Sequence, residues 1–449
     1  MKDLPAVLGG VPVRKPASGV HTPIITDLDR LHVDAYLRAA DFQPGSETLS
    51  APRVIAPTNV GRCGSAAEHR ALSDEFTQVH GAGTDDFHSV PVSNGTRAIS
   101  IALTAVAAHA RRLGLRPPST GDNVIVPALT WSGTATAVLD RGLVPRIADV
   151  EADTLCIDPA SVRALVDERT FAIVAVHLYN RVSDLDALTA IADRHGIALV
   201  EDCAHAHGAR HRGRPVGTIG VAGTFSLQAS KPLTCGEGGI VTTGDRLLAE
   251  QVCSLANCGR PCGDAIAIPG CNDRLPGLSA ALARAQLTQF AVRHATRGDA
   301  WRRLDDIATD LPGVEPLPAQ FDTVAPTYKW AARYPLKHWG GMSLDQLADG
   351  LSAELDVEVG RIYEPLTRSR LYQPLNDPFV AGSRCRDEIV PSGYRCPTAD
   401  DLYESVLVVA HAAAMSADFP EAYRAAVRKL QEHKRSLASR PHLQKGAWL

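Results

Sequence analysis

Two residues that can do covalent and proton chemistry, Asp202 and Lys231, each follow a short apolar run. A carboxylate at the end of a buried strand can pair with a protonated ring nitrogen and keep that ring charged. A lysine in a partly desolvated crevice has a lowered pKa, and its neutral amine can form a Schiff base with a carbonyl compound. Taken singly, each has a plainer interpretation: a helix cap or ion pair for the aspartate, and a solvated charge for the lysine.

A phosphate seat is predicted at Gly95 and Thr96, within the stretch 93–100. This stretch follows the apolar run 89–92 and opens a long pattern typical of an amphipathic helix. Free backbone N–H groups and the helix dipole favour a phosphate at such a helix start. An ordinary side-chain cap is the alternative.

Other polar and aromatic residues stand at similar places. Trp131 follows an apolar run and can stack on a planar ring, although a core tryptophan is the plainer interpretation. Ser226 and Gln228 can donate to a phosphate, and His205 and His207 alternate so that both could face one pocket. Two histidines are weak evidence for a metal, and no metal site is predicted. The order of phosphate seat, aromatic, aspartate and lysine is the layout of a fold-type I pyridoxal-phosphate enzyme.

These residues need a sheet to position them. Short, almost continuously apolar runs alternate with helical patterns such as 184–195, which indicates an α/β domain with a mostly parallel sheet covered on both faces. Ligands of such sheets lie outside the carboxyl ends of the strands, where the residues above stand. The predicted strands cover 124–129, 145–150, 172–178, 198–202, 224–228 and 239–243.

Flanking patterns set the expected domains. An amphipathic helix is expected over 65–80, and a long helix over 276–294 leaves the first domain. We expect residues 1–296 to form an N-terminal arm and the large cofactor-binding domain, with a loop at 41–63. Residues 297–449, with a helix at 344–355 and a basic tail, are expected to form a smaller domain.

Composition excludes several classes of protein. The chain has 449 residues, a net charge of −4 and ten cysteines. This charge favours neither nucleic acid nor an anionic membrane as a partner. The sequence has no run long enough for a membrane span and no apolar leader, so we expect a cytoplasmic protein. The cysteines are expected to be free thiols, since Cys253, Cys258, Cys262 and Cys271 lack the regular spacing of a metal site.

The chain closely resembles the sugar aminotransferases of the DegT/StrS type, from about residue 8 to residue 372. The resemblance is most specific in 201–208 and 230–239, and 270–274 looks like the family's G-x-N-x-R motif. It implies pyridoxal phosphate as cofactor and the fold-type I aminotransferase fold. That fold has a mixed, mostly parallel seven-stranded sheet flanked by helices, and a smaller C-terminal α+β domain. It also implies ping-pong transamination between an amino donor and a ketone.

The resemblance further implies a role for each matching residue. Lys231 forms the internal aldimine with the cofactor, and Asp202 pairs with the pyridine nitrogen. His205 lies near the phenolic oxygen, and Trp131 stacks on the ring. Asn272 reaches the phosphate of the neighbouring subunit, which makes a homodimer part of the active site. The phosphate is held by Gly95, Thr96, Ser226 and Gln228. The residues expected to contact substrate are Tyr179, Asn180 and Tyr363.

Within that family, the stretches 176–179, 258–261 and 363–372 favour enzymes that act on scyllo-inosose or 2-deoxy-scyllo-inosose with glutamine as donor, in aminocyclitol antibiotic biosynthesis. Asn180 stands where the family usually has glycine, and Leu227 where it has phenylalanine, so the substrate pocket can differ. Four alternatives stay open at this point: a 3-amino-5-hydroxybenzoate synthase, a nucleotide-sugar aminotransferase, a dehydratase of the same family, and a non-catalytic protein that binds pyridoxal phosphate.

Overall fold

The computed structural model describes residues 6, 12–13, 65–81 and 87–439. The predicted loop 41–63, the first residues of the family resemblance and the end of the basic tail lie outside the described residues. Among the described helices, none is both long and apolar enough to cross a membrane.

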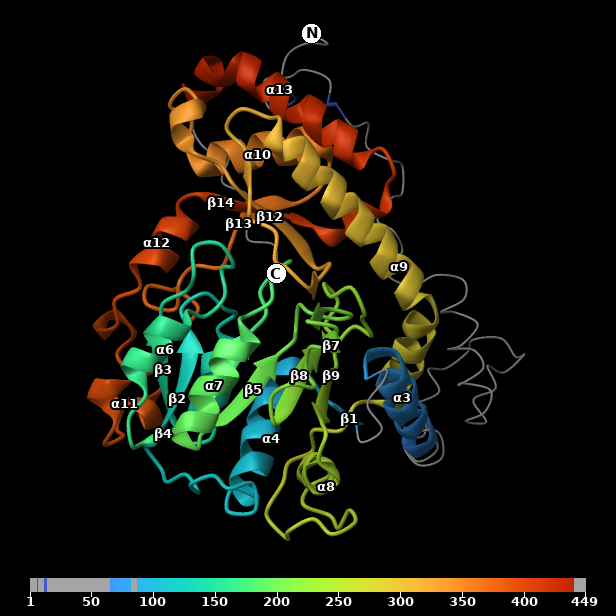
Figure 1. Ribbon diagram of the computed structural model, residues 1–449, viewed down its shortest axis with the longest axis vertical. Coiled ribbons are helices and arrows are strands. Elements are labelled where there is room, and N and C mark those ends of the chain that lie inside the picture. Colours follow the sequence, from blue (N-terminus) through green and yellow to red (C-terminus); the bar gives the residue numbers. More distant parts are fainter. Residues whose placement is uncertain (1–5, 7–11, 14–64, 82–86, 440–449) are drawn as a thin grey trace, which may run out of the picture.

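A seven-stranded sheet forms the centre of the larger part of the molecule (Figure 1). Strand β9 runs antiparallel to both of its neighbours, β1 and β8, whereas the remaining pairs are parallel. The prediction of a mixed, mostly parallel sheet is therefore confirmed. In spatial order the strands are β1 (His88–Val92), β9 (Gly239–Thr243), β8 (Ala222–Ser226), β5 (Ala198–Asp202), β4 (Thr170–Val176), β2 (Asn123–Pro127) and β3 (Val144–Ala148).

Helices cover both faces of this sheet. Side chains of a strand alternate between faces, so a strand that is apolar throughout presents an apolar surface on each face. Val124 and Val126 belong to one hydrophobic core and Ile125, between them, to another. The first core includes α4 (Gly95–Ala108), α5 (Gly133–Leu139) and α8 (Arg246–Ala256). The second includes α3 (Ser65–His80), α6 (Pro159–Leu165), α7 (Leu185–His195) and the first half of α9 (Gly277–Thr309).

Beyond this sheet, α9 continues to a second sheet (Figure 1). The sequence predicted that this helix ends near residue 294, and this was wrong: Trp301 and Leu304 extend its buried stripe into a third core. The helix thus crosses residue 296, and the domain boundary there stays a proposal. The third core also contains α10 (Leu344–Leu355), as predicted, and α13 (Phe419–Ala438).

The second sheet is antiparallel and has four strands in the order β10, β12, β14, β13. A third sheet of three short strands has the order β11, β6, β7. The bounds are β10 Glu315–Pro316, β12 Lys329–Arg333, β14 Val406–Ala410, β13 Val359–Arg361, β11 Thr323–Val324, β6 Arg210–His211 and β7 Arg214–Pro215. The remaining described helices are η2 Leu336–His338, η3 Pro374–Asn376, α11 Pro378–Ala381, η4 Arg386–Glu388, η5 Pro391–Gly393, α12 Pro397–Tyr403 and η6 His411–Met415.

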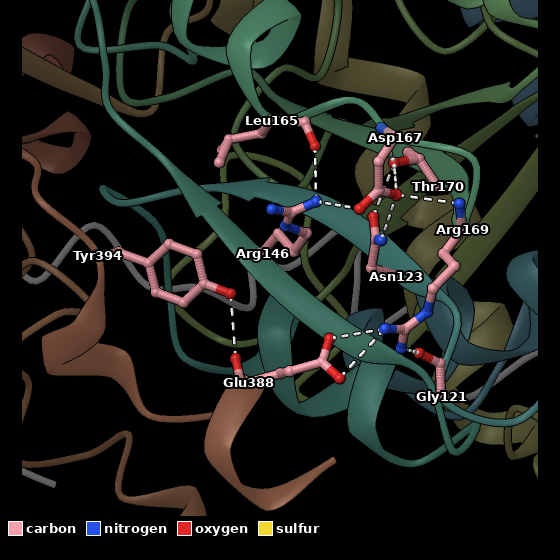
Figure 2. Close-up of polar contacts among 9 residues, drawn as sticks. All are labelled: Gly121, Asn123, Arg146, Leu165, Asp167, Arg169, Thr170, Glu388 and Tyr394. Atoms are coloured by element: carbon pink, nitrogen blue, oxygen red, sulfur yellow. Dashed lines mark hydrogen bonds and ion pairs between the residues drawn. The ribbon is translucent and has the colours of Figure 1, made fainter.

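The segment that holds η4 and η5 returns to the large sheet, where a polar network anchors it (Figure 2). Arg169 donates to both carboxylate oxygens of Glu388, at 3.1 and 3.0 Å. Tyr394 donates to the backbone oxygen of Glu388 at 3.1 Å, and Arg146 pairs with Asp167. This network lies at the amino ends of β2 and β4, away from the residues predicted to do chemistry.

Candidate active site

Asp202 is the last residue of β5, and its buried carboxylate is held at both oxygens. Thr134 Oγ1 donates to Oδ2 at 2.9 Å, and the backbone N–H of Ala204 donates to Oδ1 at 3.1 Å. Burial raises the pKa of Asp202, whereas these two hydrogen bonds and the charge of Lys231 act to lower it. The result is a rigid carboxylate at the carboxyl edge of the sheet.

Lys231 lies in the loop that follows β8, and its backbone N–H donates to the oxygen of Gln228 at 2.9 Å. Its Nζ lies 4.4 Å from the centre of the Tyr328 ring. Burial lowers the pKa of Lys231, and Tyr328 and Asp202 offset part of this effect. A lowered pKa increases the share of neutral amine, the form that attacks a carbonyl carbon.

The predicted phosphate seat lies between the start of α4 and the end of β8. Asn94 caps the helix by accepting the N–H of Arg97 at 2.9 Å. The next N–H groups of a first turn have no acceptor within a helix. A Cβ on Gly95 would lie 2.8 Å from Cβ of Ser226, so only glycine fits this close approach. Backbone N–H groups and the Ser226 hydroxyl thus meet in one cradle.

Trp131 lies beside this seat, and 50% of its side chain is exposed. The alternative of a core tryptophan is therefore wrong. Its ring centre lies 5.8 Å from that of Tyr363. A Cβ on Gly133 would lie 2.6 Å from Thr96 Oγ1 and 2.9 Å from Trp131 Cδ1, which brings the tryptophan and the start of α4 into one tight turn.

Aromatic side chains from three elements surround His205. The N–H of Tyr179 donates to its Nδ1 at 3.2 Å, so its proton is on Nε2, which lies 3.4 Å from the Tyr363 hydroxyl. The Tyr328 ring centre lies 4.1 Å from that of His205. Burial, with the charges of Lys231 and Lys329, holds the pKa of His205 well below its usual range. The imidazole is a neutral donor at Nε2.

The structure brings Tyr179 and Tyr363 together, since the Tyr363 N–H donates to the Tyr179 hydroxyl at 2.7 Å. Tyr179 has a φ of +55°, a left-handed conformation that is rare for a bulky residue. Asn180 is only 3% exposed, and its Oδ1 has no hydrogen-bond partner among the described residues. His207, in contrast, packs against His80 and Phe225 in the second core, so the expectation that it shares a pocket with His205 was wrong.

Gln228 and Asn272, both predicted to reach a phosphate, have different surroundings within one chain. The Oε1 of Gln228 accepts the N–H of Ser230 at 2.8 Å and so supports the loop that carries Lys231. Asn272 is exposed. The next residue, Asp273, anchors the Asn272 loop, because Arg97 Nε and Nη2 bind its carboxylate at 3.1 and 2.8 Å.

Sequence reasoning missed Tyr328 and a buried cluster of His177, Glu201 and Cys203. His177 Nδ1 accepts the N–H of Ser183 at 3.1 Å, so His177 Nε2 donates to Glu201 at 3.2 Å. Three backbone N–H groups within 217–220 also donate to Glu201, at 2.7 to 2.8 Å. Burial acts to raise the pKa of Glu201, but these donors outweigh it and lower that pKa. The cluster is a filled structural network, on the strand that carries Asp202.

The arrangement fits the parts of pyridoxal phosphate. Lys231 offers an amine for the aldehyde and Asp202 a carboxylate for the ring nitrogen. Trp131 offers an exposed ring face, and the cradle at Gly95 and Ser226 offers donors for the phosphate.

Comparison with known proteins agrees with this geometry. A model of the DegT/DnrJ/EryC1/StrS aminotransferase family matches residues 53–418. The L-glutamine:2-deoxy-scyllo-inosose aminotransferase of Streptomyces lividus is 38% identical over 368 residues, 79% of this chain and 84% of that protein. The L-glutamine:scyllo-inosose aminotransferase of Streptomyces griseus is 36% identical over 383 residues, 82% and 88% of the two chains. The crystal structure of 3-amino-5-hydroxybenzoic acid synthase has a TM-score of 0.71 at 27% identity, over 91% of this chain and 97% of that one.

Proposed function

The chain belongs to the DegT/DnrJ/EryC1/StrS aminotransferase family and is a pyridoxal-phosphate-dependent transaminase, and from this premise we propose that it moves an amino group from L-glutamine onto a ketocyclitol or a keto-sugar. The observation that carries the substrate proposal is the likeness to the two inosose aminotransferases over about four fifths of the chain. The proposal includes a ping-pong cycle, in which the donor leaves before the ketone reacts, and a place in aminocyclitol antibiotic biosynthesis in the cytoplasm.

Lys231 is the proposed catalytic base and acid. When bound, the cofactor supplies an aldehyde that links to an amine and a ring that takes up electrons when a C–H bond breaks. Lys231 Nζ would hold the cofactor through its aldehyde. When its amine is free, neutral Nζ would take the proton from the donor Cα and so act as base and then as acid. The lowered pKa of Lys231 increases the share of neutral amine, the form that accepts a proton.

Asp202 and His205 are proposed to fix the charge on the ring. An ionised Asp202 keeps a proton on the ring nitrogen, and this cation in turn favours the ionised carboxylate despite burial. His205 carries its proton on Nε2 and can donate it in a hydrogen bond to the phenolic oxygen. Trp131 covers one ring face. The proposed phosphate ligands are Gly95, Thr96, Ser226 and Gln228.

The acceptor is proposed to lie against Tyr179, Asn180 and Tyr363. The unpaired Oδ1 of buried Asn180 supports a polyhydroxy substrate, because a substrate hydroxyl can supply the donor that this oxygen lacks. Tyrosine hydroxyls provide further donors and acceptors. This gives the ring hydroxyls of a cyclitol or sugar polar partners beside Lys231.

A homodimer is proposed because the resemblance places Asn272 at the neighbouring subunit's phosphate, and Asn272 is exposed on a loop that Arg97 anchors through Asp273. Its amide would donate to the cofactor phosphate in the neighbouring subunit. Light scattering of the loaded protein tests the assembly. An increase in the dissociation constant of pyridoxal phosphate on Asn272→Ala, with an unchanged dimer, would support the shared site.

The substrate proposal is tested by incubating loaded protein with L-glutamine and one acceptor at a time, followed by mass spectrometry. The acceptors are scyllo-inosose, 2-deoxy-scyllo-inosose and a nucleotide keto-sugar. We expect the aminated cyclitol and 2-oxoglutaramate. Amination of the nucleotide sugar alone, or of no acceptor, would contradict the cyclitol assignment. The fold likeness to 3-amino-5-hydroxybenzoic acid synthase makes formation of that aromatic acid the necessary comparison.

A further inference from the structure

We propose that Thr134 is a positioning residue that holds the Asp202 carboxylate in the orientation needed to face the cofactor's ring nitrogen. This inference rests on the proposed function of Asp202. It assigns a task to a hydroxyl outside the predicted site.

The geometry is a one-way chain of hydroxyl groups. Thr130 Oγ1 lies 2.8 Å from Thr134 Oγ1, which lies 2.9 Å from Asp202 Oδ2. An ionised carboxylate can only accept, so the single proton of Thr134 points to Asp202. The Thr134 oxygen is then free to accept the proton of Thr130. All three side chains are buried, with Thr134 only 2% exposed.

Two donors thus hold one carboxylate from two elements, α5 and the turn after β5. Thr134 binds Oδ2 and the Ala204 N–H binds Oδ1, so rotation about the side-chain bonds of Asp202 would break one or both bonds. Hydrogen bonds to a charged acceptor are about twice as strong as neutral ones. Each oxygen keeps a lone pair, so the ring nitrogen can still be bound.

The electrostatic surroundings give the hydroxyl a second effect. Lys231 and His177 act on Asp202 through their charges, and the Asp202 charge in turn raises the pKa of Tyr363 and of Cys203. Burial raises the pKa of Asp202, and the Thr134 bond counters that rise. Removal of this bond favours the protonated acid, which cannot keep the ring nitrogen charged.

The turn that carries Thr134 also carries the proposed ring-stacking residue. Gly133 lies close to both Thr96 at the start of α4 and Trp131, and the next residue, Thr134, binds Asp202. Thr134→Val isolates the effect of the hydrogen bond to Asp202, because valine keeps the shape of threonine and removes only the hydroxyl donor.

The test compares Thr134→Val and Thr134→Ser in the full-length, loaded protein. A stopped-flow spectrometer measures the rate constant for bleaching of the visible cofactor band by L-glutamine, and steady-state assays give KM for the donor. We expect Thr134→Val to lower the rate constant by about 10- to 100-fold, the effect of losing one hydrogen bond to a charged group. KM should change little. Serine keeps the hydroxyl and should restore most of the rate.

A pH titration of the cofactor spectrum gives a measurement that a change in packing alone would not alter. The spectral transition that reports the ring-nitrogen proton should shift to lower pH in Thr134→Val, because the neutral carboxyl no longer stabilises that proton. Thr136→Val is the matched control: it removes an exposed hydroxyl that donates only to the Ser132 oxygen, and it should behave as wild type.

Asp202→Asn separates this inference from the proposed function. If Asp202→Asn is slow while Thr134→Val is as fast as wild type, the proposed function stands and the inference is wrong. If Asp202→Asn is itself fast, both are wrong. If Thr134→Val does not fold, Thr130→Val decides, since removal of its support for Thr134 should slow the reaction severalfold, and an unchanged rate would overturn the proposal. Equal loss in the serine and valine variants would identify a packing effect and also overturn it.

Discussion

The Nζ of Lys231 lies 4.4 Å from the centre of the Tyr328 ring. The Tyr328 hydroxyl lies 3.1 Å from Oγ of Ser230, the residue before Lys231. The two titrating groups affect each other. Burial alone would raise the pKa of Tyr328, but Lys231 and Lys329 lower it, and Tyr328 in turn opposes the fall in the pKa of Lys231. Tyr328 therefore shifts the pH at which Lys231 becomes a neutral amine.

Tyr328→Phe should lower the pKa of Lys231 further, because the ring remains and the polar oxygen is lost. A lower pKa leaves the amine neutral at lower pH, so the pH midpoint for binding of pyridoxal phosphate to the apoprotein should fall. Stopped-flow association rates across pH measure this midpoint. Tyr403→Phe, on α12, is the control and should leave it unchanged. A midpoint that rises in Tyr328→Phe would contradict the account.

Lys231→Ala should remove the covalent link to the cofactor and lower turnover by several orders of magnitude. The check is borohydride reduction of the loaded protein followed by mass spectrometry, which should show the cofactor's added mass in wild type and none in the variant. Lys329→Ala removes a nearby lysine that contacts the same Tyr328 ring at 5.6 Å, and it should keep the added mass. A labelled Lys231→Ala protein would disprove the assignment.

Gly95→Ala should damage the phosphate seat, because its Cβ would lie 2.8 Å from the Ser226 Cβ. Overpacking of this kind costs roughly 1–3 kcal/mol. The strain should weaken binding of pyridoxal phosphate more than binding of pyridoxal, which has no phosphate. Equilibrium titrations of both compounds measure the difference. Gly360→Ala places a methyl group in open space and should leave both affinities unchanged. Equal weakening for both compounds would argue against a phosphate seat.

His80 makes stability depend on pH. Burial lowers its pKa to about 3, and neither ring nitrogen has a partner among the described residues. Between that value and the unfolded value near 6.5, the unfolded chain binds the extra proton, so stability is lost as pH falls. His80 alone should reduce the free energy of unfolding by about 1.6 kcal/mol between pH 6.5 and pH 5. Urea unfolding at both pH values should show a smaller loss in His80→Phe. An equal loss would contradict this origin.

The sequence predicted the elements that carry the chemistry well, since each is set by local patterns. Strands β5 and β9 have the bounds expected from their apolar runs, and α10 has those expected from its periodicity. The end of α9 was predicted too early, because its buried stripe changes partners midway, from the second core to the third. Charged residues between the two halves hide this continuation from a periodicity argument.

Long-range contacts were beyond local patterns for a different reason. Glu201 faces away from Asp202 because the side chains of neighbouring strand residues alternate between faces. Its partner His177 directly follows the adjacent strand β4, so the pair is joined only when the two strands align. No local signal marks Tyr328, which lies just before β12 and more than ninety residues from Lys231. The hydroxyl chain from Thr130 to Asp202 likewise depends on the packing of α5 against the edge of the sheet.

The most direct test of the account is the absorbance spectrum of the purified, cofactor-loaded protein before and after L-glutamine is added, with L-glutamate and L-alanine for comparison. We predict that glutamine bleaches the visible band, that 2-oxoglutaramate forms in equal amount, and that scyllo-inosose or its 2-deoxy form restores the band. A visible band that no amino acid bleaches would contradict transamination from these donors and favour a non-catalytic role for the bound cofactor.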